Sequence, residues 1–135
     1  IKPIMKSEFF LRLPSEDAGP DDAATGQDLL DTLLEHEHEC VGLAANMIGV
    51  RKRIICVKDG NRALLMYNPQ ILEQVNAYQT SEGCLSLIGE RPCTRYRRIK
   101  VEYLDENFVH RIKNFSGYTA EIIQHEIDHC CGIVI

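Results

Sequence analysis

The stretch QHEIDHCC, residues 124–131, predicts both a closing helix and the chemistry of this sequence. It contains the pattern H-E-x-x-H, in which His125 and His129 are four positions apart. At about 3.6 residues per turn, two side chains with this spacing project from the same face of a helix and can bind one metal ion. Glu126 is next to the first histidine, within reach of a water molecule on that ion. The pattern indicates metal-assisted hydrolysis, although a polar helix can also match it by chance.

The third metal ligand is expected upstream of these histidines. Only residues 130–135 follow His129, so we do not expect the downstream third ligand of the zinc proteases that share the pattern. Cys84 in the segment SEGCLS, residues 81–86, is the strongest candidate, because the glycine before it lets the backbone approach closely. Two imidazoles and one thiolate leave one position of a tetrahedral ion open, which is typical of a catalytic site.

Three segments make the sequence similar to the peptide deformylase family. They are VGLAA at residues 41–45, EGCLS at residues 82–86 and QHEIDH at residues 124–129, in the order and spacing of that family. The resemblance runs over nearly the whole chain. The first motif of the family reads G-x-G-x-A-A-x-Q, whereas this sequence has Cys40 at the first glycine position and Met47 at the glutamine position.

The resemblance implies an amide hydrolase that removes the formyl group from the N-terminal formyl-methionine of nascent polypeptides. Cys84, His125 and His129 would bind one divalent metal ion per chain, with Fe2+ favoured and Zn2+ or Ni2+ as alternatives. Glu126 would accept a proton from the attacking water and return it to the departing amine. The backbone N–H of Leu85 would stabilise the charge that develops on the carbonyl oxygen.

Met47 affects how the charge that develops on the carbonyl oxygen is stabilised. A thioether has no hydrogen to donate where the family has a glutamine amide. Removing one such donor typically lowers activity about a hundredfold to a thousandfold, so we expect lower activity than in a Met47→Gln variant. Asn46 does carry an amide, but neighbouring side chains of an extended segment point to opposite faces. It would replace the glutamine only if the backbone were locally twisted.

The resemblance also implies where the substrate lies. The peptide would run extended beside Val41 and Gly42, joined to them by main-chain hydrogen bonds. Tyr118 and Ile122 continue the helix stripe of the two histidines, and an apolar surface beside an open metal site suits the methionine side chain. Alternatively, these two residues simply pack in the core. Two further positions match family residues that line this region: Glu82 and Arg91.

Two other interpretations stay open. The first is a related hydrolase that acts on another small acylated amine. The second is a metal-containing binding protein with the same fold and little turnover, since Met47 replaces the family glutamine. Glu126 counts against a pure binding protein, because a proton-accepting group beside an open metal position serves a reaction.

Size and composition favour one domain, residues 1–135, because a chain of this length with 44% apolar residues can form one core. The net charge of −5 gives no general attraction to nucleic acid, so no sequence-specific nucleic-acid binding is expected. The sequence has no apolar run long enough for a membrane and no secretion-signal layout. Six irregularly spaced cysteines fit a reducing compartment, with Cys56 as a buried core residue. We therefore expect a cytoplasmic protein.

An α+β fold is expected, with antiparallel sheets packed around the C-terminal helix that carries the histidines. The patterns predict a loosely structured lead-in over residues 1–24, an amphipathic helix over 25–39 with a solvated end, strands within 53–82 and 98–112, and a closing helix capped by Ser116.

The basic run at residues 91–100 is interpreted as a solvated strand edge. The role of the family in translation makes a transient ribosome contact through this run worth testing.

Overall fold

Five antiparallel strands form one sheet in the computed structural model, which describes residues 3–84 and 86–133. The order across the sheet is β1-β2-β3-β4-β5, so each strand pairs with its neighbour in sequence. The strands are β1 (Gly42–Ala44), β2 (Ile54–Asp59), β3 (Arg62–Cys84), β4 (Leu87–Leu104) and β5 (His110–Ser116). The helices are α1 (Glu8–Leu11), α2 (Ala23–Glu35) and α3 (Gly117–Cys130), with short 3-10 turns η1 (Pro20–Asp22) and η2 (Ala45–Ile48).

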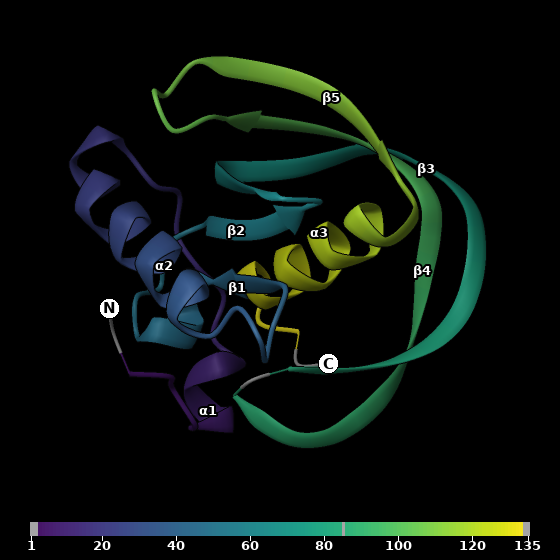
Figure 1. Cartoon of the computed structure of the whole chain (residues 1–135), viewed down its shortest axis with the longest axis horizontal. Coiled ribbons are helices and arrows are strands. Elements are labelled where there is room, and N and C mark those ends of the chain that lie inside the picture. The colour runs from purple at the N-terminus through teal and green to yellow at the C-terminus, as the bar shows by residue number, and fades with distance from the viewer. Residues whose placement is uncertain (1–2, 85, 134–135) are drawn as a thin grey trace.

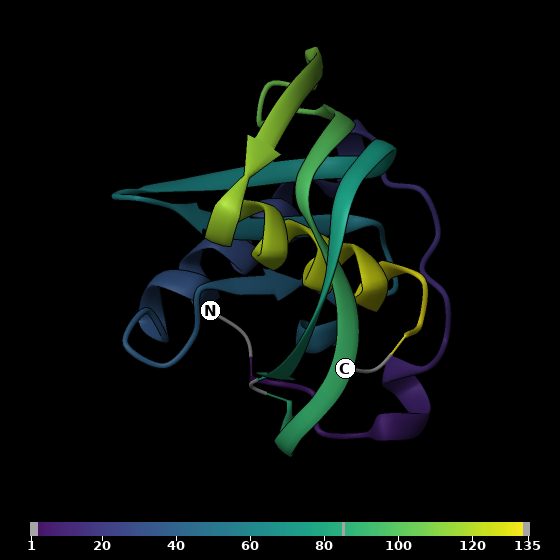
Figure 2. The same ribbon diagram turned by 90° about the vertical axis from the view of Figure 1, so that its right-hand side faces the viewer.

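Strands β3 and β4 are long and curve around α3 (Figures 1 and 2). Their pairing register shifts between Tyr67 and Gln70 and again beyond Ile71, and such irregularities bend a strand. Asn68 and Asn76 have positive φ values of 53° and 64°, which asparagine tolerates better than most residues. The predicted antiparallel sheet around a C-terminal helix is confirmed, but the separate strands expected between residues 63 and 82 are one bent strand.

Both predicted hairpin turns are present. Strand β2 reaches Asp59, which pairs with Arg62 across a two-residue connection. In the turn after β4, the carboxylate of Asp105 accepts hydrogen bonds from the backbone N–H groups of Asn107 (2.9 Å) and Val109 (3.0 Å). A side-chain acceptor of this kind replaces the strand partners that the turn residues lack.

The core lies on both sides of β1 and β2. Helix α3 buries Ile123, Ile127 and Cys130 on one stripe, as the sequence predicts. Helix α2 lies on the other side of these two strands (Figure 1) and buries Leu29 and Leu33. The expected end of α2 at residue 39 is wrong, because the helix ends at Glu35 and residues 36–39 form a turn.

The N-terminal segment is ordered by contacts with the rest of the chain. Ser7 caps α1 by accepting a hydrogen bond from the backbone N–H of Phe10 (3.2 Å), and Leu11 is fully buried. Further along, the backbone N–H of Ser15 donates to the carbonyl oxygen of Cys130 at the end of α3 (2.9 Å). The prediction of a loosely structured lead-in is therefore wrong for this part of the chain.

The helices and the cysteines bear on membrane insertion and on disulfide bonding. Within the described ranges, none of the helices combines the length and the apolar character that crossing a bilayer requires. No disulfide joins the cysteines in the part of the chain that the structure describes. Cys56 is fully buried, as predicted, and burial raises the pKa of its thiol to about 12.

Candidate active site

The two histidines of α3 direct their Nε2 atoms at the same small volume. These atoms are 3.2 Å apart, and a tetrahedral ion with metal–nitrogen bonds of about 2.1 Å places two nitrogen ligands about 3.4 Å apart. One ligand atom from each of His125, Glu126 and His129 lies within 4.8 Å of the others, and all three side chains are buried. The residues present therefore fit a divalent metal ion.

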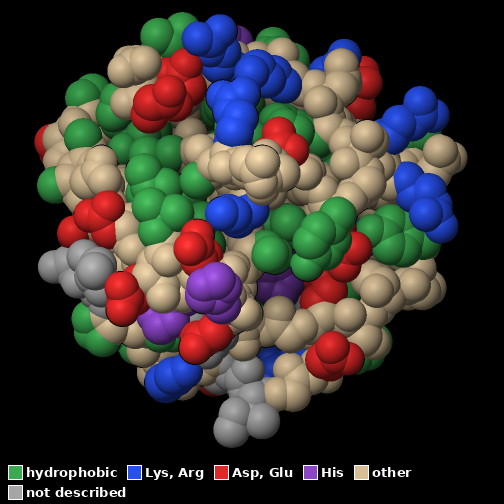
Figure 3. Space-filling model, in the orientation of Figure 1, with side chains coloured by type: hydrophobic (Ala, Val, Ile, Leu, Met, Phe, Trp, Pro, Cys, Tyr) green, Lys and Arg blue, Asp and Glu red, His purple; other side chains and the backbone are tan. Residues whose placement is uncertain are grey.

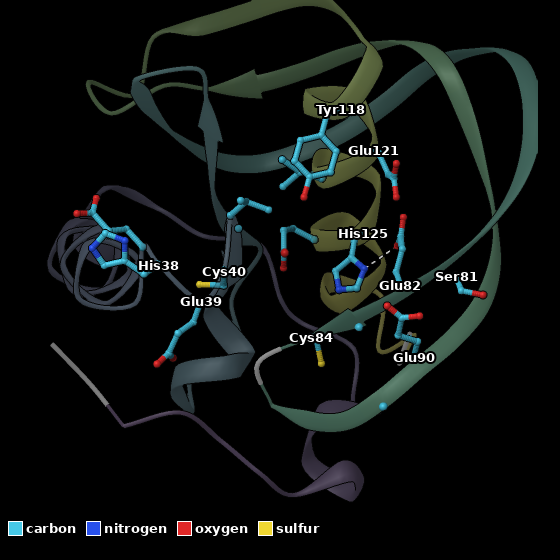
Figure 4. Close-up of a pocket in the computed structure, with 17 residues that line it drawn as sticks. His38, Glu39, Cys40, Ser81, Glu82, Cys84, Glu90, Tyr118, Glu121 and His125 are labelled. Carbon is cyan, nitrogen blue, oxygen red and sulfur yellow. Dashed lines mark hydrogen bonds and ion pairs between the residues drawn. The ribbon is translucent and has the colours of Figure 1, made fainter.

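The thiol of Cys84 lies next to the ring of His125. It makes a side-chain hydrogen bond with His125, and Figure 4 shows the two side chains as neighbours at the end of β3. The structure thus places Cys84 beside His125, while the side chains whose ligand atoms all lie within 4.8 Å of one another are His125, Glu126 and His129. Leu85, the expected oxyanion donor, lies outside the described residues.

A buried ionic network holds His125 in position. Glu82 Oε1 lies 2.7 Å from His125 Nδ1 and accepts a hydrogen bond from Arg95 Nη2 at 2.7 Å. The other end of the Arg95 guanidinium donates to Asp128 Oδ2, also at 2.7 Å. A carboxylate on the second nitrogen of a metal-binding imidazole fixes the orientation of the ring. The interpretation of residues 91–100 as a solvated edge is wrong for Arg95, which is only 4% exposed.

The pKa values of the site reflect burial and these contacts. Burial raises the pKa of Glu126 to about 7, and its Oε1 atom has no hydrogen-bond partner in the described structure. Burial alone would lower the pKa of His125, but hydrogen bonds with Cys84 and Glu82 outweigh it and raise the pKa to about 10. Burial and the nearby charge of His125 lower the pKa of His129 to about 3. A carboxyl group with a pKa near neutrality suits proton transfer.

Glu82 has its pKa shifted in the opposite direction from Glu126. Burial alone would raise the pKa of Glu82, but hydrogen bonds with His125 and Arg95 hold the pKa well below its usual range. Glu82 therefore stays ionised, whereas Glu126 can take up a proton near neutral pH.

We expect Glu82→Gln to lower metal affinity about 10-fold to 100-fold, because losing the partner of a metal-binding imidazole has typically had this effect. Competition with a chelator measures the affinity. Glu102→Gln is the matched control, since Glu102 Oε2 also contacts a histidine, His110 Nε2 at 2.7 Å, but on the exposed surface. Equal affinities in the two variants would contradict a positioning role for Glu82.

Strand β1 brings a glycine against the carboxyl group of Glu126. A Cβ atom added at Gly42 would lie 2.7 Å from Ile122 Cγ2 and 2.8 Å from Glu126 Oε2. Both distances are shorter than van der Waals contact, so one of these side chains would have to move. Position 42 therefore needs glycine for the site to keep its shape.

Gly42→Ala is expected to lower kcat/KM about a hundredfold, because small displacements of a catalytic group are costly. Metal content should stay close to that of the unaltered protein, since the added methyl group meets Glu126 and not the imidazoles. Steady-state kinetics together with metal analysis test this. Unaltered kinetics would show that Glu126 tolerates the displacement.

A cleft of about 720 Å³ opens above His125 and Glu126. Residues 37–42 form one wall, residues 81–84 with 89–90 form the opposite wall, and α3 supplies the floor. Figure 3 shows this face, with acidic side chains and histidine side chains gathered close together below its middle. Val41, Gly42, Glu82, Tyr118 and Ile122 all line the cleft. Their positions agree with the region expected for the substrate.

Two sequence-predicted residues lie away from the walls of this cleft. Arg91 donates a hydrogen bond from Nη2 to Glu8 Oε1 at 3.2 Å. Met47 is 1% exposed, and its sulfur atom accepts a contact from the backbone N–H of Ala44 at 3.5 Å. Neither residue is among those that line the cleft in the described structure.

Asn46 does not take over the position of the glutamine. Asn46 lies in the 3-10 turn η2, so the expectation that this segment is extended is wrong. The Asn46 amide nitrogen donates instead to the carbonyl oxygen of His129 at 2.9 Å. Met47 therefore occupies the position of the family glutamine, and the neighbouring Asn46 amide supports the end of α3.

Sequence reasoning missed several residues of the cleft. Glu37, His38 and Glu39 line one wall because α2 ends early and the chain turns back. Glu121 lines the floor, and its Oε1 atom accepts a hydrogen bond from the hydroxyl of Tyr78 at 3.1 Å. Helical spacing could have identified Glu121, since it is three positions after Tyr118 on the same face.

Residues that fit a metal ion lie on a helix at the bottom of an open cleft, and a carboxyl group that can accept a proton lies beside them. This arrangement is that of a metallohydrolase. The chain belongs to the polypeptide deformylase family, whose model matches residues 4–135. Members of this family are metal-dependent. The reaction of the chain is the removal of the N-formyl group from nascent peptides.

Individual relatives agree with this assignment. The chain is 52% identical over 135 residues to a peptide deformylase of Clostridium beijerinckii, covering 100% of this chain and 99% of that protein. It is 38% identical over 111 residues to peptide deformylase 1 of Clostridium perfringens, covering 80% and 74%. A class I type b peptide deformylase structure from Acinetobacter baumannii has a TM-score of 0.88 at 30% identity, covering 99% of this chain and 96% of that chain.

Proposed function

We propose that Cys84, His125 and His129 bind the metal ion and that Glu126 is the catalytic acid and base of the deformylase reaction. The observation that carries this proposal is the 3.2 Å approach of the two Nε2 atoms next to a buried carboxyl group without a partner. The hydrogen bond between Cys84 and His125 supports the thiol as third ligand. Fe2+ is the favoured ion, with Zn2+ or Ni2+ as alternatives, since this ligand set accepts all three.

Glu126 and Glu82 have different roles in the proposed hydrolysis. A divalent ion held by Cys84, His125 and His129 would supply Lewis acidity and would lower the pKa of water to about 7. Glu126 accepts a proton from the attacking water on its carboxylate and transfers it to the amine nitrogen that leaves the formyl carbon. Its burial, at 4% exposure, excludes bulk water from that proton transfer. Glu82 keeps His125 oriented throughout through the contact at Nδ1.

The peptide is proposed to extend strand β1. This strand is at the edge of the sheet and pairs only with β2 in the described structure, so its other side can receive main-chain hydrogen bonds. Gly42 lies next to Glu126 on that strand, which would bring a peptide at this edge close to the proton acceptor. The methionine side chain would then contact Tyr118 and Ile122.

Charge on the formyl oxygen is proposed to be stabilised by the metal ion and the backbone N–H of Leu85. Met47 supplies no donor at the family glutamine position, so turnover is proposed to be lower than in family members that have the glutamine. Low turnover would also fit a chain that mainly binds its ligand, which makes measured rates essential.

Four further assignments complete the proposal. Residues 1–135 act as one catalytic domain, and the protein works in the cytoplasm, where formylated chains are made. Formyl-methionyl nascent peptides are its partners, without sequence-specific nucleic-acid binding. The basic side chains of β4 that stay accessible, such as Arg98, would make a transient contact with the ribosome.

The proposal is tested by formate release from formyl-Met-Ala-Ala with protein loaded anaerobically with Fe2+. We expect release that stops when a chelator removes the metal and returns when Fe2+ is restored. Acetyl-Met-Ala-Ala serves as the control for another acyl group, and faster hydrolysis of the acetyl peptide would favour a different substrate. A rate equal to that of the Glu126→Ala variant would exclude the enzyme mechanism.

A further inference from the structure

A chain of hydrogen bonds leads from Tyr78 in β3 to the ring of His125. The hydroxyl of Tyr78 donates to Glu121 Oε1 at 3.1 Å. The carboxyl group of Glu121 makes a side-chain hydrogen bond with that of Glu82. Glu82 Oε1 then lies 2.7 Å from His125 Nδ1. Figure 4 shows the carboxyl groups of Glu121 and Glu82 beside each other, next to the ring of His125.

The spacing of these four residues explains why they meet. Tyr78 and Glu82 are four positions apart in β3, and side chains an even number of positions apart leave the same face of a strand. Glu121 and His125 are four positions apart in α3, which puts them on the same face of a helix. One pair from the strand and one pair from the helix therefore face each other, and the proposed proton transfer by Glu126 uses neither Tyr78 nor Glu121.

The contact between the two carboxyl groups requires a proton on one of them, since an ionised carboxylate can only accept. The hydrogen bond with Glu82 and burial both raise the pKa of Glu121. Burial alone would raise the pKa of Glu82 as well, but hydrogen bonds with His125 and Arg95 hold it well below its usual range. The proton therefore lies on Glu121, which donates to Glu82 and accepts from Tyr78.

Glu82 is held unevenly by its other partners. His125 Nδ1 and Arg95 Nη2 both make their contacts, at 2.7 Å, with Glu82 Oε1. Glu82 Oε2 is held less closely, by Arg95 Nε at 3.1 Å. A carboxylate held mainly through one oxygen atom can turn about that contact, and the orientation of a metal-binding imidazole follows that of its carboxylate partner. Glu121 is the further partner that limits this turning.

The outer end of the chain is held by strand β4. The guanidinium carbon of Arg97 lies 4.7 Å from the centre of the Tyr78 ring, and a cation over an aromatic face attracts the ring. Tyr78 and Glu121 are both half-buried, so water competes less for their hydrogen bond than it does on an open surface.

We propose that Glu121, held in place by Tyr78, is a positioning residue that keeps Glu82 oriented toward His125 and thereby strengthens metal binding. This role rests on the proposed function, in which His125 is a metal ligand. Removing the carboxyl group of Glu121 takes one hydrogen-bond partner from Glu82 and one from Tyr78. Since Glu121 acts through Glu82, the effect should appear in metal affinity.

Glu121→Leu should lower the affinity for Zn2+ about threefold to tenfold, the fold-change that corresponds to the loss of one hydrogen bond. Glu121→Gln should keep the affinity of the unaltered protein, because an amide both donates and accepts, as the protonated carboxyl group does. Competition with a chelator measures the affinity, and thermal unfolding verifies that each variant is folded. Glu73→Leu is the matched control, since Glu73 is a carboxylate of β3 on the exposed surface, 3.6 Å from Lys100 Nζ.

A double-mutant cycle tests whether Glu121 acts through Glu82. The loss caused by Glu121→Leu should largely disappear when Glu82→Ala is already present, because the link to His125 is then gone. Equal losses in both backgrounds, no loss in Glu121→Leu, or a Glu121→Gln variant as weak as Glu121→Leu would each overturn this role. An unaltered protein that binds no Zn2+ would instead refute the proposed function, and this role with it.

Discussion

Replacing Glu126 with alanine should lower kcat/KM for a formyl-Met peptide by about 10²-fold to 10⁴-fold, the range typical of a general acid and base. The carboxyl group is 4% exposed, has an unpartnered oxygen atom and has a pKa that burial raises to about 7. No other proton acceptor shares its position, because the histidines beside it are proposed to be occupied by metal. Formate release under anaerobic conditions measures the loss.

Metal content separates this effect from loss of the metal. Glu126→Gln keeps the size of the side chain but not its proton acceptor, so it should bind metal normally and lose about as much activity as the alanine variant. Glu106→Ala, which removes an exposed carboxylate from the turn after β4, should change neither property. If Glu126→Gln retained most of the activity, the assignment of Glu126 as the proton carrier would be wrong.

Met47→Gln should raise kcat by about a hundredfold to a thousandfold if the amide supplies a missing oxyanion donor. Methionine and glutamine have side chains of similar length, and Met47 is 1% exposed, so the replacement changes chemistry more than volume. The structure adds a requirement. The Met47 sulfur faces the backbone N–H of Ala44 at 3.5 Å, so the new side chain must turn from that contact toward the cleft.

Met47→Leu is the matched control, because it removes the sulfur without adding a donor and should produce no gain. Thermal unfolding of both variants checks that the buried position tolerates the change. An unaltered rate in a folded Met47→Gln protein would show that the metal ion and backbone donors suffice without this side chain.

Local spacing explains which parts of the site the sequence could predict. His125 and His129 converge because a helix repeats about every 3.6 residues, and that repeat is visible in one short segment. Ile123 and Ile127 are identified as core residues by the same argument. Cys84 stands out among the upstream Cys, His, Asp and Glu residues because the glycine before it lets the backbone approach closely. Each of these inferences depends only on neighbours in sequence or on residue type.

The missed residues depend on contacts between distant segments. Arg95 belongs to a basic run that the sequence predicts to be exposed. Only in the folded chain do Glu82 and Asp128 contact its guanidinium group. Glu39 was assigned to a solvated helix end, but α2 ends at Glu35 and the following turn faces the cleft. A few residues of error at a helix end were therefore enough to hide one wall of the site.

The unpaired side of β1 also affects how molecules of this protein meet one another. Open strand edges are sites at which identical chains can pair and aggregate. Here the unpaired strand edge is only as long as Gly42–Ala44, whose three residues are all buried, and short edges are a common protection against such pairing. The short edge that is proposed to receive a formylated peptide thus disfavours self-association.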